Sequence, residues 1–240
     1  MDIINRGFVF LRTNGPVALV RHIAAFPKYR WELFKAQSRI FFKNNRVKIR
    51  GNAVRVNQNG VVVNLRIQQD PINTIGLVFE NFLYEEYKQL NPKGRNIIDI
   101  GASIADTPLY FAARGARHVY GYEISKVRQS EARTNLALNP ELAKKITYIN
   151  QGVNAQKLNA LVSKIGICSI KIDCDNPKLE RDLIKGLQKG GKLNKIDELI
   201  MEYSDGCEPM NKILVDSDFE VSVPPITGYG NGGILFAKHR

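Results

Sequence analysis

Residues 97–107 read IIDIGASIADT and carry the strongest fold signal of the chain. A short apolar run is followed at once by small residues, and a helical pattern starts directly after them. Gly101 and Ala102 allow the backbone to approach a bound ligand closely, while Ala105 allows the helix to pack near the strand. Asp106 or Thr107 is the expected N-cap of that helix. The turn therefore predicts a ligand site at the carboxyl end of a strand.

Outward from this turn, apolar strand patterns alternate with helical ones to the end of the chain. Strands are expected at 96–100, 118–122, 146–149, 167–172, 196–203, 219–223 and 234–238, and helices at 106–114, 125–138, 154–163, 177–187 and 208–215. Such alternation predicts a mostly parallel sheet covered by helices on both faces. The last two strands have no helix between them, so the seventh strand should run antiparallel.

The chain before residue 96 has a different pattern. Residues 53–57 and 61–67 alternate around Asn57-Gln58-Asn59-Gly60, which predicts a β-hairpin. Apolar residues at helical spacing predict a helix over 73–89. Two further helices are expected at 16–26 and 28–43. We therefore divide the chain into a basic helical segment, 1–50, and an α/β domain, 51–240, whose core spans 96–240.

The formal charge of +12 is concentrated near the start of the 240-residue chain. Residues 1–60 hold twelve Lys/Arg and two Asp/Glu, a net charge of +10. This predicts an anionic partner, such as RNA or a membrane surface, for residues 28–50. A basic face that only aids solubility is the alternative. The helix at 28–43 also carries aromatic residues, which favour docking on the core.

No membrane span or signal peptide is expected, so we predict a cytoplasmic protein. The longest apolar runs fall well short of the ~20 residues that cross a bilayer. Cys168, Cys174 and Cys207 fit neither metal-ligand spacing nor a disulfide framework. No metal site is predicted from them.

Glu123 ends the second predicted strand, 22 residues after Gly101. A carboxylate there can accept hydrogen bonds from both ribose hydroxyls of an adenosine. The turn lacks the Gly-x-Gly-x-x-Gly pattern of dinucleotide sites, and Asp106 near the helix start would repel a pyrophosphate. Carboxylates such as Asp99 and Asp106 instead favour the sulfonium and amino groups of S-adenosylmethionine, the cofactor that we expect.

Several segments resemble the FkbM-type methyltransferases, a family of the class I methyltransferases with their Rossmann-like fold. The likeness is carried by the turn itself, 99–107, and continues over roughly residues 60–240. The other segments are Tyr110-Phe111, Gly115-Ala116, Val119–Glu123, Asn135–Asn139, Ile170–Asp175, Met201–Tyr203, Phe219–Val221 and Gly233–Ala237. Seven strands with the last one reversed are typical of that fold.

The resemblance implies methyl transfer from S-adenosylmethionine to an oxygen, usually a hydroxyl of a small molecule or a glycan. It implies that Asp173 faces the transfer site. Carboxylates at strand ends can act as general bases, and Asp173, Asp175 and Glu202 are our candidate catalytic residues. The predicted cofactor-binding residues are Asp99, Gly101, Ala102, Ser103, Asp106, Thr107, Glu123 and Asp173.

One departure from the family concerns residues 175–178. The family tends to have Glu-Gly-x-Glu where this chain has Asp175-Asn176-Pro177-Lys178, so a carboxylate is replaced by Lys178. This motivates an alternative, a cofactor-binding protein without catalysis. Asp175 can also serve to cap the following helix. Three carboxylates could instead hold Mg²⁺, and the basic segment leaves an RNA methyltransferase open. The loop 228–233, rich in glycine, is a candidate lid.

Overall fold

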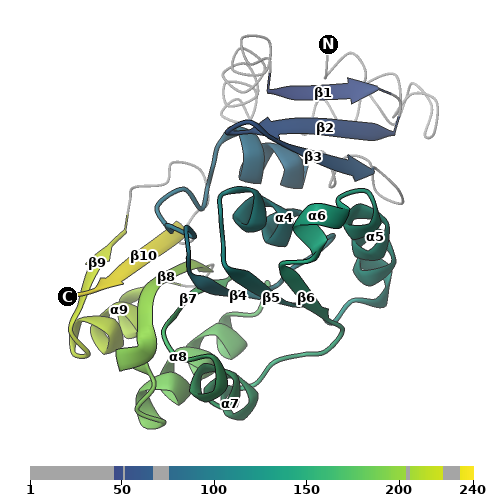
Figure 1. Cartoon of the computed structure of the whole chain (residues 1–240). Coiled ribbons are helices and arrows are strands. Elements are labelled where there is room, and N and C mark those ends of the chain that lie inside the picture. The colour runs from purple at the N-terminus through teal and green to yellow at the C-terminus, as the bar shows by residue number, and fades with distance from the viewer. Residues whose placement is uncertain (1–45, 51, 67–75, 204–205, 224–232) are drawn as a thin grey trace, which may run out of the picture.

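The computed structural model describes residues 46–50, 52–66, 76–203, 206–223 and 233–240. Outside these ranges lie the helices expected at 16–26 and 28–43. The loop expected to act as a lid, 228–233, lies outside them except for Gly233. Within them the chain forms a seven-stranded sheet with helices on both faces and a small three-stranded sheet beyond one helical layer (Figure 1). No described helix combines the length and apolarity needed to span a bilayer.

The large sheet has the strand order β6-β5-β4-β7-β8-β10-β9. Parallel pairing joins β6, β5, β4, β7 and β8, whereas β10 is antiparallel to both β8 and β9. The expected mixed sheet with a reversed last strand is thus confirmed. The strands are β4 (Asn96–Ile100), β5 (His118–Tyr122), β6 (Ile146–Ile149), β7 (Cys168–Ile172), β8 (Ile196–Tyr203), β9 (Phe219–Ser222) and β10 (Gly233–His239).

Helices cover the two faces of this sheet in separate layers (Figure 1). One layer holds α4 (Asp106–Ala113), α5 (Lys126–Ala137) and α6 (Pro140–Ala143), and the other α7 (Ala155–Ile165), α8 (Pro177–Lys189) and α9 (Glu208–Val215). β4 is buried on both sides, which explains why isoleucines occupy both of its faces. The short α6 and a 3-10 turn, η2 (Leu193–Lys195), were not predicted, because such brief segments give too few repeats to show a period.

The small sheet contains the predicted hairpin, β2 (Ala53–Gln58) and β3 (Val61–Arg66). Asn59 and Gly60 have φ values of 53° and 87°, the left-handed pair that a two-residue turn requires. An unpredicted strand, β1 (Val47–Arg50), pairs with β2. The sheet therefore joins residues on both sides of the domain boundary expected at residue 50.

Two asparagines of the Asn135–Asn139 segment attach the small sheet to the core. Asn139 Oδ1 accepts from Asn64 N of β3 at 2.8 Å, and Asn135 Oδ1 accepts from Arg66 N at 2.8 Å. Asn135 Nδ2 also donates to the carbonyl of Ile104 at 2.9 Å. These buried amides connect β3 and α5 to the turn that follows β4, which explains the residue type at both positions.

The prediction of a helix over 73–89 is wrong for the second half of that range. Residues 76–78 are helical and continue into a π-helix, η1 (Phe79–Leu83), but the chain then turns. Glu85 adopts a left-handed φ of 51°, which ends the helix, and its Oε1 accepts from Gln58 Nε2 of the small sheet at 3.1 Å. Tyr87, the last apolar residue of the expected helix, is buried all the same, though from a turn.

Candidate functional site

The predicted turn lies at the carboxyl edge of the sheet, between β4 and α4. Its backbone is unusual, because Gly101, Ser103 and Ala105 have φ values of 83°, 43° and 66°. A Cβ atom built on Gly101 would lie 1.6 Å from the carbonyl oxygen of Asp173, at the end of β7. Only glycine fits this position, because the close approach leaves no room for a Cβ atom and the left-handed φ disfavours one.

A cavity of about 410 Å³ opens beside this turn, over the ends of β4, β5 and β7. Gly101, Ser103 and Glu123 line it, and so does Ile124, an apolar side chain that is 75% exposed. The cavity continues along the start of α5 and of α8. The two features that the sequence singled out, the small-residue turn and the strand-ending carboxylate, thus share one hollow.

Glu123 is held in place by two backbone amides. Its Oε2 accepts from Ser103 N at 3.0 Å and its Oε1 from Ser125 N at 2.6 Å. The side chain therefore connects the turn after β4 to the start of α5, whose first residues Ser125 also caps. A carboxylate has about four acceptor positions, so both oxygens keep capacity for hydroxyl donors from a ligand.

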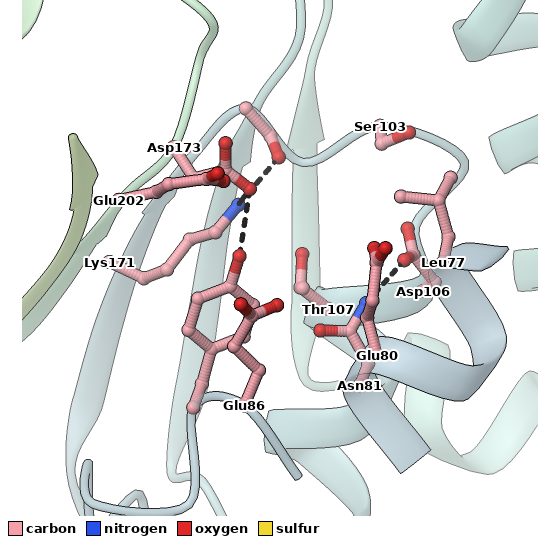
Figure 2. Close-up of a pocket in the computed structure, with 12 residues that line it drawn as sticks. Leu77, Glu80, Asn81, Glu86, Ser103, Asp106, Thr107, Lys171, Asp173 and Glu202 are labelled. Carbon is pink, nitrogen blue, oxygen red and sulfur yellow. Dashed lines mark hydrogen bonds and ion pairs between the residues drawn. The ribbon is translucent and has the colours of Figure 1, made fainter. Parts of the chain in front are cut away.

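A second cavity, of about 200 Å³, adjoins the first, and Leu77, Gly101, Ser103 and Asp173 line both (Figure 2). Its walls are rich in carboxyl groups. Those of Glu80 and Asp106 stand on one side and those of Asp173 and Glu202 on the other, with Glu86 between them. The sole cation among the described lining residues is Lys171.

Lys171 lies beneath this cavity and is almost fully buried. Its Nζ is 3.1 Å from Asp99 Oδ1 and 3.4 Å from Asp173 Oδ2, and it donates to the carbonyl of Gly101 at 2.8 Å. Burial alone would lower the pKa of this ammonium, but the two carboxylates raise it above its usual value. Lys171 thus stays charged and ties β7 to the turn.

Asp173 and Glu202 form a hydrogen-bonded carboxyl pair at the ends of β7 and β8. Burial would raise the pKa of Asp173, but Lys171 and hydrogen bonds hold it below its ordinary value. One of these bonds comes from the hydroxyl of Tyr87, at 2.8 Å. Burial and the charge of Asp173 raise the pKa of Glu202 to about 8. At neutral pH Asp173 is therefore ionised, and Glu202 holds the proton.

Two further carboxyl groups of the smaller cavity have raised pKa values. Burial, followed by the charges of Glu80 and Asp173, raises the pKa of Glu86 to about 7. Burial likewise raises the pKa of Asp106 to about 7, against the lowering effect of Lys171. The cavity therefore concentrates acids that are only partly ionised at neutral pH.

The N-cap expected at Asp106 or Thr107 is wrong. Ala105 occupies the N-cap position without any side-chain hydrogen bond, and its left-handed φ directs the two polar side chains elsewhere. Thr107 Oγ1 donates to Asp99 Oδ2 at 2.5 Å, and Asp106 Oδ2 accepts from Asn81 Nδ2 at 2.6 Å. Both side chains thus connect α4 to its surroundings in place of capping it.

The remaining predicted residues lie in three different places. Asp99 and Ala102 are fully buried and line neither cavity; Ala102 N donates to the carbonyl of Tyr122 at 2.9 Å. Asp175 lines the larger cavity but Glu202 the smaller one, so our three catalytic candidates do not share one cavity.

Within the described ranges, no group of three or more His, Cys, Asp or Glu side chains is arranged to hold a metal ion. The cap of α8 is Asn176, whose Oδ1 accepts from Leu179 N at 3.0 Å.

The lining residues that were not among the predicted site residues include four polar ones from η1 and the turn after it, namely Glu80, Asn81, Glu86 and Tyr87. The apolar residues of this segment, Tyr87 among them, are at helical spacing and indicated a core helix. Tyr87 does pack in the core, but its hydroxyl reaches Asp173. The one available signal was Glu86, a polar residue on the apolar face of the expected helix, four residues after Phe82.

No protein-family model matches this sequence, and a search of curated proteins finds no match. Many solved structures are similar. A protein of the NADB-Rossmann superfamily from Streptococcus agalactiae has 21% identity and a TM-score of 0.50, over 65% of this chain and 66% of its own. This chain thus spans just under two thirds of that structure's length.

Two enzymes are among the other similar structures. Magnesium protoporphyrin IX methyltransferase from Synechocystis PCC 6803, solved with bound S-adenosylmethionine, has 18% identity and a TM-score of 0.49 over 71% of this chain and 81% of its own. A ribosomal protein L11 methylase from Lactobacillus delbrueckii subsp. bulgaricus has 17% identity and a TM-score of 0.47 over 72% of this chain and 80% of its own. At these identities the likeness concerns the fold, and the chain has a Rossmann-like α/β fold.

Proposed function

We propose that this protein is an S-adenosylmethionine-dependent methyltransferase. One observation carries the proposal: the close-approach turn at Gly101 and the carboxylate of Glu123 line the same cavity at the carboxyl edge of the sheet. Ligands of open α/β sheets bind at this edge. A carboxylate in this position suits the two ribose hydroxyls of an adenosine, and the exposed apolar side chain of Ile124 offers a surface for its base.

The charges of the site favour a cationic donor over a dinucleotide. A pyrophosphate would need free donors at the start of α4, but Asp106 is buried there. The described lining of the smaller cavity has many carboxyl groups and one ammonium, that of Lys171, which is already paired. S-adenosylmethionine supplies a methyl group on a positively charged sulfur, and these carboxyl groups favour positive charge.

The predicted cofactor residues then have two kinds of role. Gly101, Ser103 and Glu123 line the larger cavity and are proposed to contact the donor. Asp99 and Ala102 are proposed to act from beneath, because they hold Lys171 and the strand β5 around the turn. Thr107 lines the smaller cavity and holds α4 to Asp99. Asp173 lines both cavities and is proposed to lie where the methyl group is transferred.

We propose a hydroxyl of a small molecule or a glycan as the acceptor, as the resemblance to the FkbM-type family implies. A hydroxyl must lose its proton when its oxygen takes the methyl group. Glu202 is the better base, because a carboxylate with a pKa of about 8 binds a proton more readily than Asp173 does. Asp173 and Tyr87 would orient Glu202 and the acceptor, and Asp175 faces the donor cavity.

Lys178 does not argue against catalysis. It lines neither cavity, so the missing family carboxylate at this position removes no acid from the described walls. Glu86 and Glu202 supply carboxyl groups from other elements. Lys178 motivated the alternative of a cofactor-binding protein without catalysis, and its position gives that alternative no support.

Calorimetry with S-adenosylhomocysteine and with NAD tests the proposal. The native chain should bind S-adenosylhomocysteine, and Glu123→Ala should weaken it roughly 100-fold, since two hydrogen bonds to a charged group are each worth ~1.5 kcal/mol or more. Glu141→Ala, an exposed carboxylate of α6, is the matched control and should change nothing. Thermal melts of each variant establish that it is folded. Preference for NAD, or equal binding by the Glu123 variant, would overturn the proposal.

A further inference from the structure

Two buried oxygen atoms beside the smaller cavity lack hydrogen-bond partners. Asn81 of η1 and Asp106 of α4 are both at least 98% buried. They bind one another through Asn81 Nδ2 and Asp106 Oδ2, at 2.6 Å. This leaves Oδ1 of each residue without a partner among the described residues. Leaving a buried acceptor unsatisfied costs ~1–3 kcal/mol, so a pair of them on one cavity wall is unexpected unless a ligand supplies donors.

The surroundings of the pair indicate a positively charged donor group. The same cavity is lined by the carboxyl groups of Glu80 and Glu86, and the pair faces Asp173 and Glu202 across it (Figure 2). The ammonium of Lys171 is engaged elsewhere. A neutral hydroxyl would satisfy one oxygen but would bring no positive charge to these carboxyl groups. A primary ammonium has three N–H donors and a positive charge, so it matches both the two oxygens and the charge.

We propose that Asn81 and Asp106 form a binding site for a primary ammonium group. This rests on the proposed function for its source, which is either the amino group of the methyl donor's own amino-acid tail or an amine carried by the acceptor. Gly101 and Ser103 line both cavities, so a ligand can extend from Glu123 past the turn to this pair. Burial raises the pKa of Asp106, and an ammonium held here would compensate the buried charge of its carboxylate.

Two ligand comparisons distinguish the sources. The first uses S-adenosylhomocysteine and the analogue in which hydrogen replaces its α-amino group. The second uses glucosamine and glucose, with and without saturating S-adenosylhomocysteine. Each is measured by calorimetry on the full chain and on two variants, Asp106→Asn, which removes only charge, and Asn81→Leu, which removes the amide. Asn159→Leu is the matched control. Asn159 Oδ1 is also buried and has no hydrogen-bond partner among the described residues, but Asn159 belongs to α7 and lines neither cavity.

A hydrogen bond to a charged group predicts that each variant weakens binding of the amine ligand roughly 10- to 100-fold. Binding of the matching amine-free ligand should change little. If this holds for the nucleoside pair, the donor's ammonium is the occupant; if it holds for glucosamine, the acceptor's is. Asn159→Leu should leave both preferences intact. The inference is overturned if native protein prefers the amine in neither comparison, or if the variants weaken both members of a pair equally.

Failure of this site and failure of the proposed function give different results. If no nucleoside binds at all, the methyltransferase proposal falls, while glucosamine without nucleoside still reports on the Asn81–Asp106 pair. If the nucleosides bind through Glu123 but the amino group contributes nothing, only the ammonium site falls.

Discussion

Replacing Gly101 with alanine should destabilise the fold and abolish ligand binding together. The new Cβ would lie 1.6 Å from the Asp173 carbonyl oxygen, so one of the two backbones must move by more than an ångström. The left-handed φ costs an L-residue ~1–2 kcal/mol. The displaced Asp173 loses its 3.0 Å hydrogen bond from N to Ile100 O, worth ~1 kcal/mol. Strain from overpacking adds ~1–3 kcal/mol.

The free energy of unfolding should therefore fall by roughly 3–6 kcal/mol, as measured by urea denaturation. Gly94→Ala is the matched control. Gly94 has a similar φ of 72°, but a Cβ there meets nothing within 4 Å, so only the conformational cost of ~1–2 kcal/mol applies. The difference between the two variants measures the close approach of β4 and β7. Equal destabilisation by both variants, or undiminished binding of S-adenosylhomocysteine by Gly101→Ala, would contradict this prediction.

Three further predictions concern the buried charges. Lys171→Met should lower the free energy of unfolding by ~3–5 kcal/mol, because it leaves buried carboxylates unpaired. Lys212→Met, the control, breaks an exposed pair and should cost under ~1 kcal/mol. Similar free energies of unfolding for the two variants in urea denaturation would contradict this. Folding raises the pKa of Glu86 and Asp106 to about 7 and of Glu202 to about 8, so the native state keeps protons that the unfolded chain has lost. Their contribution is full in acid and lost as pH rises, so the free energy of unfolding should fall from about pH 5 to about pH 8; a rising curve would contradict the assignment. The methyl-transfer rate should increase with pH and level off above about 8, since Glu202 must be ionised to act as base; a Glu202→Gln profile that keeps this limb would show that another group is the base.

Local patterns were enough to predict most of the fold. The alternating strands and helices after residue 96 depend on periodicity within each segment, and burial on both faces produced the apolar runs that marked the strands. The hairpin followed from Asn59-Gly60, because few other pairs accept two left-handed residues. Gly101 and Glu123 were found because each stands at the end of a strand, and parallel strand ends meet at one edge.

The placement of the η1 segment could not be predicted from its own residues. Periodicity tells which side chains share a face, but it does not tell that Glu85 would end the helix by contacting the small sheet. That turn carries Glu86 and Tyr87 to the ends of β7 and β8, about a hundred residues away in sequence.

The chain thus determined by itself a Rossmann-like sheet, the turn at Gly101 and the carboxylate of Glu123, because each depends on neighbours in sequence. Three-dimensional packing sets which acids share a cavity, which of them keep their protons, and that Asn81 and Asp106 face one another. Those properties arise from burial and from pairs of charges on distant segments, and neither is encoded in a local pattern.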